Sequence, residues 1–262
     1  MFAMQQTPRY FLALVSVSIG LCGCGSEVYD QRFKGNTLVF LNDQSQLDTN
    51  LTGEWQKRGI HMRLPAGFSE VPTPKDGWTT LRLPDRRELE LPGILGVFTK
   101  EVAAVTSTGG TLNVPSRIAI LSNREFLESR GATQDDPGGR IEPAKFESTV
   151  RFSFQEVLPT NAKVGDTEII GGRNFQPTLR YDLSHFHNMG SQGIPYDISL
   201  YNYQQASGGV QVAVIVMAPH ELARSESLLT QLPLSLRTLR IENPAAQGDG
   251  AAGGAPSGGP RF

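Results

Sequence analysis

Short stretches in which apolar and polar residues alternate recur along most of this chain, with turn residues between them. Alternation sends successive side chains to opposite faces of an extended backbone, so it is typical of half-buried strands. It predicts, together with short apolar runs, strands at residues 37–41, 60–64, 78–83, 94–105, 116–121, 150–154, 179–187, 196–205 and 210–217. The last stretch is almost wholly apolar, which favours a central strand covered on both faces. Ser207-Gly208-Gly209 precedes it and predicts an antiparallel hairpin.

Helical signals are fewer. Ser122 and Glu125 have the spacing of a capping box and predict a short helix that ends at Gly131. Pro219 opens a second predicted helix, which runs to about Leu232 with leucines at near-helical spacing. These patterns together predict an α+β fold, a mostly antiparallel β-sheet with a few helices packed on it.

The N-terminus has the parts of an export signal. Arg9 precedes an apolar run of 11 residues, Phe11–Leu21, which is too short to cross a bilayer because a span needs about 20. The run ends in Leu21-Cys22-Gly23-Cys24, which resembles a bacterial lipobox, with Cys22 departing slightly from the usual residue. The resemblance implies a lipoprotein signal peptide over residues 1–23 and lipidation of Cys24; a plain signal peptide or a frayed apolar N-terminus is the alternative.

Composition also suggests the domain boundaries. Residues 24–36 are mostly polar without periodicity and predict a tether, followed by a single domain over 37–242 with a loop excursion near 132–143. In residues 243–262, 14 of 20 are Gly, Ala or Pro, so this segment cannot bury enough surface to offset its ordering entropy. We expect a disordered tail there; a tail that docks in the cell wall is the alternative.

Charge and cysteine content exclude several classes of function. A net charge of −2 predicts no general attraction to nucleic acid or to an anionic membrane surface. Both cysteines lie in the export signal, so the mature domain has no disulfide, no cysteine metal site and no thiol nucleophile.

Two segments carry a resemblance to a known family. Gly59–Phe68 is similar to the strand followed by Pro-x-Gly-aromatic at the entry of the PsbP-like superfamily, which includes DcrB-type bacterial lipoproteins and a nuclear Ran-binding relative. Residues 209–237 are similar to its closing strand, helix and Ser-Leu-Arg ending. The resemblance covers about residues 59–241 and implies a sheet sandwiched between helices, in a binding or assembly factor. It transfers no functional residue, and residues 95–176 exceed the family's pattern.

Candidate chemistry centres on two histidines. The chain contains no nucleophile-elbow, dinucleotide, phosphate-loop or His-Glu-x-x-His motif. On a strand, His185 and His187 project from one face and form a first pair of metal ligands, with Asp197 or His220 as a third. A mixed, partly exposed sheet surface is the alternative reading. His61 is expected to be solvated.

These observations leave two classes of function. We expect a membrane-anchored envelope lipoprotein that acts as a non-enzymatic binding or assembly module, without cofactor, for another envelope protein. The alternative is an envelope hydrolase or a metal-binding protein with an unpatterned site. A binding module predicts an apolar patch with a polar rim, whereas an enzyme predicts a pocket of converging titratable groups. The domain would face the periplasm or the exterior, and Gly25 resembles an outer-membrane sorting signal in a host with two membranes.

Overall fold

A computed structural model describes residues 26–72, 79–128, 143–158, 163–170, 178–206 and 209–242. The chain divides into two compact units, one of residues 1–49 with 173–175 and one of residues 50–172 with 176–262. The predicted signal peptide with Cys24, the predicted loop near 132–143 and the predicted tail lie outside the described residues.

The first unit contains one long helix, α2 (Ser26–Asn50). The strand predicted at residues 37–41 is therefore wrong, and most of the predicted tether is helical. A five-residue apolar run has no periodicity that separates strand from helix, so its type depends on what surrounds it. Here the hydroxyls of Thr37 and Thr49 each donate to the carbonyl four residues earlier, at 2.8 Å, as helical geometry allows.

The second unit is built on a seven-stranded antiparallel sheet in the order β3-β6-β7-β11-β10-β9-β8. Its strands are β3 (Ser69–Val71), β6 (Ile94–Val105), β7 (Thr111–Ser122), β8 (Lys163–Ile170), β9 (Leu179–Met189), β10 (Pro195–Gln204) and β11 (Gln211–Pro219). All nine residues of β11 are buried, because this strand lies fourth of seven and both sheet faces above it are covered. The predicted central strand and its hairpin with β10 are confirmed.

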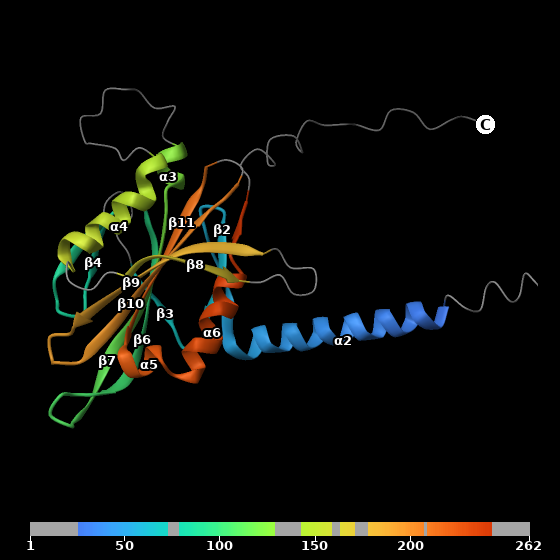
Figure 1. Ribbon diagram of the computed structural model, residues 1–262, viewed down its shortest axis with the longest axis horizontal. Helices are drawn as coiled ribbons and strands as arrows, with labels where there is room; N and C mark the ends of the chain where they lie inside the picture. Colours follow the sequence, from blue (N-terminus) through green and yellow to red (C-terminus); the bar gives the residue numbers. More distant parts are fainter. Residues whose placement is uncertain are drawn as a thin grey trace, which may run out of the picture. The chain divides into compact units, whose positions relative to one another are not determined.

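Smaller elements cover the two faces of the sheet. They are β1 (Leu51–Lys57), β2 (Ile60–Pro65), β4 (Thr79–Arg82), β5 (Glu88–Leu91), α3 (Arg124–Glu128), the 3-10 turn Pro143–Lys145, α4 (Phe146–Val157), α5 (His220–Ala223), α6 (Glu226–Arg237) and β12 (Arg240–Ile241). Figure 1 shows α4 and β4 to one side of the sheet, with α6 and β2 to the other. The predicted α+β class, a mostly antiparallel sheet with a few helices packed on it, is confirmed.

Strand alternation divides the core in two. On one face Val212, Val214 and Val216 of β11 pack with residues of β2 and α6. On the other face Ala213 and Ile215 pack with residues of α4, β4 and β5. One sheet thus supports two apolar layers, and each layer needs its own cover.

The prediction of a strand over residues 150–154 is wrong, because these residues lie in α4. Phe146, Val150 and Phe154 are buried at a spacing of four, while Phe152 is 64% exposed. Val150 and Phe154 fit an alternating strand and a helical face equally well. The apolar residues at 150, 152 and 154 therefore did not distinguish a strand from a helix.

Both predicted helices differ from the prediction. Helix α3 begins at Arg124, and the Ser122 hydroxyl accepts from the Arg124 amide at 3.2 Å, while the Ser122 amide donates to the Gly93 carbonyl. Glu125 therefore does not complete a capping box; its carboxylate lies 3.5 Å from Arg58. The helix predicted after Pro219 is divided, since α5 ends at Ala223 and Ser225 caps the start of α6.

Candidate functional site

A pocket of about 430 Å³ opens between the α6-side face of the sheet and the segment α5–α6. We call it the histidine pocket, since three histidines line it or contact its lining. Its polar residues are Glu168, His185, His187, Asp197 and Ser199, and its apolar residues are mainly Val216, Ala218, Ala223, Leu228, Leu229, Leu232 and Pro233. All of them belong to the second unit.

Strand register brings the polar residues together. Tyr181 and Leu183 of β9 belong to the α6-side core, so the alternation of the strand places His185 and His187 on the same face. In the ladder between β9 and β10, His187 lies opposite Asp197 and His185 lies opposite Ser199. Side chains directly opposite in an antiparallel pair are close enough to bond.

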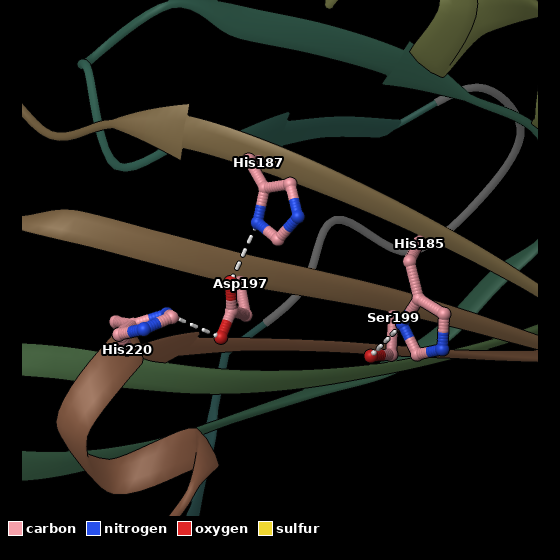
Figure 2. A network of polar contacts seen from close by, with 5 residues as sticks. All are labelled: His185, His187, Asp197, Ser199 and His220. Atoms are coloured by element: carbon pink, nitrogen blue, oxygen red, sulfur yellow. Dashed lines mark hydrogen bonds and ion pairs between the residues drawn. The ribbon is translucent and has the colours of Figure 1, made fainter. Parts of the chain in front are cut away.

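One carboxylate holds two imidazoles. His187 Nδ1 lies 2.6 Å from one oxygen of Asp197, and His220 Nδ1, from the start of α5, lies 2.8 Å from the other oxygen. Figure 2 shows the two rings approaching Asp197 separately, one along each dashed contact. An Nδ1–H on each ring can donate to the carboxylate.

The third histidine makes a separate contact. His185 Nδ1 lies 3.0 Å from the Ser199 hydroxyl, away from the Asp197 cluster, as Figure 2 also shows. A hydroxyl beside an imidazole is the first part of a nucleophilic site. Both residues are half-buried.

The predicted metal pair is thus divided between two partners. His185 lies against Ser199, whereas Asp197 contacts both His187 and His220. The two suggested third ligands are therefore grouped with His187 and not with His185. Nδ1 of His187 and Nδ1 of His220 each contact one oxygen of Asp197. Within the described ranges, no group of three or more His, Cys, Asp or Glu residues has the geometry to hold a metal ion.

Burial shapes the electrostatics at the inner end of the pocket. Burial raises the pKa of the Glu168 carboxyl, and the nearby His185 acts in the opposite direction. Burial also raises the pKa of Tyr201 and of Tyr181, and the charge of Glu168 adds to both shifts. The Tyr181 hydroxyl donates to the Leu236 carbonyl at 2.8 Å, which ties the sheet to α6.

His61 and Trp55 make contacts outside the histidine pocket. His61 is not solvated as expected: it lies between Glu54 and Glu242, at 3.3 and 2.9 Å. Trp55 packs edge-on against Phe98 with ring centroids 5.5 Å apart.

Sequence reasoning missed the apolar wall and the inner carboxylate of the pocket. The leucines of α6 served only to predict a helix, and Glu168 was not considered because no strand was predicted at β8. The β8 sequence does not alternate, since residues 165–168 are glycine or polar, and only the register with β9 places Glu168 opposite Tyr181. Among the described helices, none is both long and apolar enough to cross a membrane.

Comparison with known proteins gives structural similarities alone. No family model matches the sequence, and no curated protein matches it. A mutant of the protein Mog1 is similar with a TM-score of 0.39 and 11% identity, over 75% of this chain and 98% of that chain. The Saccharomyces cerevisiae Ran-binding protein Mog1p is similar with a TM-score of 0.37 and 11% identity, over 73% of this chain and 95% of that chain. A protein of unknown function from Pseudomonas aeruginosa, PA94, is similar with a TM-score of 0.32 and 10% identity, over 64% of this chain and 99% of that chain.

Proposed function

We propose that this chain is a lipid-anchored envelope protein that binds a protein partner through the histidine pocket and catalyses no reaction. The observation that carries the proposal is the apolar wall of the pocket with Leu229 at 61% exposure beside it. An exposed large aliphatic side chain next to a mostly apolar concavity with a polar rim is the arrangement of a docking site. The occupant that fits is an apolar side chain of another envelope protein, with its backbone polar groups against His187 and His220.

The contact between His185 and Ser199 favours a second candidate, an acyl hydrolase. A tetrahedral intermediate needs backbone or side-chain donors aimed at its oxyanion. Ser199 lies in the middle of β10, paired with His185 on one side and Val216 on the other, so the local amides are engaged in the sheet ladder. This arrangement supports binding over hydrolysis.

The hydrolase candidate has a direct test. Wild type and Ser199→Ala are compared for release of p-nitrophenol from its acetate and butyrate esters. We expect the same background rate from both proteins. Saturable turnover that Ser199→Ala abolishes would establish the second candidate in place of the first.

The docking site can be tested by photocrosslinking in intact envelopes. A photoreactive phenylalanine analogue at Leu229 should give one discrete adduct with another protein. The matched control is the same analogue at Phe152, which is similarly exposed, at 64%, but lies on α4. Ala223→Glu, which introduces a charge into the pocket wall, should abolish the adduct at Leu229.

Equal adducts at Leu229 and Phe152 would contradict the proposal, since they would report general surface contact. An adduct that persists in Ala223→Glu would contradict it as well. Thermal melting of each variant checks that the fold is retained.

The anchor is a separate part of the proposal, and it is supported by the lipobox-like residues Leu21–Cys24. Cys24→Ser should leave the precursor uncleaved or release the protein from the membrane fraction, because stable attachment needs more than one acyl chain. Fractionation and mass measurement of the mature N-terminus check this. Normal processing and retention of Cys24→Ser would refute the anchor.

We also propose that the domain belongs with PsbP-like and DcrB-like proteins. The support is the strand β2, which ends at Pro65 and is followed by Gly67, and the closing order of β11, α5 and α6.

A further inference from the structure

A second pocket lies away from the histidine pocket, at the end of the sheet where β7 meets the turn between β9 and β10. Its volume is about 380 Å³. Arg82 of β4, Arg86 of the β4–β5 turn and Arg117 of β7 all line it. We call it the arginine pocket.

Arginine supplies all the charge in the described lining of this pocket, although Glu88 lies opposite Arg82 in the strand register and Glu101 acts on Arg117 from outside the lining. None of the described residues that line the pocket is acidic, although the whole chain has a net charge of −2. The nearest carboxylate along the chain, Asp85, is already engaged: Arg87 donates to it from Nε at 2.7 Å and from its backbone amide at 3.0 Å. Burial acts to raise the pKa of Asp85, but the bonds and charge of Arg87, together with a hydrogen bond from Asn188, lower that pKa overall.

Arg117 is the inner charge of the pocket. Its Nη1 donates to the Arg82 carbonyl at 2.8 Å, which orients the guanidinium. Burial lowers the pKa of Arg117; Tyr196 and Glu101 act against this shift, while Arg82 acts with it. A partly desolvated guanidinium beside a second one is stabilised by an anion that replaces the lost water.

The remaining walls combine polar and apolar groups. Asn113, Ser191 and Gln192 supply neutral hydrogen-bonding side chains, and Val114, Ile194 and Tyr196 supply apolar surface. The Tyr196 hydroxyl donates to the Pro115 carbonyl at 3.2 Å, which holds the ring in place. The pocket can therefore hold both a charged group and an organic body attached to it.

We propose that the arginine pocket binds a phosphate ester, with the phosphate oxygens held by Arg82, Arg86 and Arg117. A guanidinium offers paired N–H donors that match phosphate oxygens, which makes arginine suited to this role. The apolar wall at Ile194 and Tyr196 contacts the organic part of the ester. This site is independent of the proposed docking at the histidine pocket.

Calorimetric titration of the full chain tests the proposal with three probes. They are inorganic phosphate, phenyl phosphate, and glycerophosphoglycerol, the soluble diester headgroup of phosphatidylglycerol. We expect an ester to bind more tightly than inorganic phosphate because of the apolar wall. Tighter binding of the monoester indicates a soluble ligand, and tighter binding of the diester indicates a lipid headgroup.

The double variant Arg82→Gln with Arg86→Gln should weaken ester binding about tenfold or more, since each lost charge-assisted bond is worth about a factor of ten. Both side chains are exposed, so the fold should be retained, as thermal melting would verify. Arg180→Gln, on β9 and outside the pocket, is the matched single-charge control and should bind as wild type does. No binding of any probe to wild type, or equal affinity in the double variant, would overturn the proposal.

Discussion

Glu168 shows how a single half-buried group can set a pH dependence. Its pKa is raised by burial against the opposing effect of His185, and it shares the pocket with Tyr201. The folded state therefore holds the carboxyl proton more tightly than the unfolded chain does. Stability from this group is present below the unfolded pKa of about 4.3 and is lost as the pH rises through the higher folded pKa.

Glu168→Gln should therefore raise the urea midpoint at pH 7 and change it little near pH 4. Glutamine keeps the shape and removes the charge that burial disfavours. Urea denaturation at the two pH values measures the effect, with Glu156→Gln on the exposed face of α4 as the control. A lower midpoint at pH 7 for Glu168→Gln would show that the carboxylate has a favourable partner instead.

At the scale of the element, α4 has a single buried face. Phe154 stacks on Phe186 of the sheet with ring centroids 5.3 Å apart and planes at 29°, and Phe146 and Val150 complete the contact. The opposite face is polar except for Phe152. The helix is thus held by one stripe of side chains, since its own propensity gives little stability at this length.

Phe154→Ala should destabilise the fold by about 3–5 kcal/mol, whereas Phe152→Ala should change stability by less than about 0.5 kcal/mol. The two substitutions remove the same atoms, from a buried site and from an exposed one. Urea denaturation of both variants gives the comparison. Similar losses for the two would favour the strand that the alternation suggests over the helix.

The sequence predicted most of the sheet because a two-residue period is local and is directly visible in β2, β6, β9 and β10. It did not distinguish α4 from a strand, since Val150 and Phe154 satisfy both periods. For the site, alternation correctly placed His185 and His187 on one face. It could not supply the register that places His185 opposite Ser199 and His187 opposite Asp197. The sequence therefore could not show that the two histidines have different partners.

At the scale of the whole unit, the C-terminal residues complete the α6-side layer. Leu236 is fully buried, Leu239 nearly so, and the Glu242 amide donates to the Gly59 carbonyl at 2.8 Å. Strand β12 pairs with β2, which lies under the same layer. Leu236 and Leu239 are therefore part of the core, and residues 240–242 are tied to its cover through β2 and Gly59.

A chain ending at Asn243 should melt as the full chain does, because residues 244–262 offer no apolar face to the fold. A chain ending at Pro233 should not fold, because it lacks buried aliphatic side chains worth about 1.5–3 kcal/mol each. Circular dichroism melting of both truncations decides this. Equal tolerance of the two would place the domain boundary elsewhere.

The position of β11 also has a consequence for how the chain acquires its structure. Its hairpin with β10 is local, but its other neighbour is β7, and the Ser122 hydroxyl reaches the Gln211 carbonyl across 89 residues. Bringing these strands together closes a long loop, which slows folding. Pulse-labelled hydrogen exchange should show the amides between β10 and β11 protected before those between β7 and β11. Until that second ladder forms, one edge of the most apolar strand stays open, so the chain depends on rapid closure or a chaperone to escape aggregation.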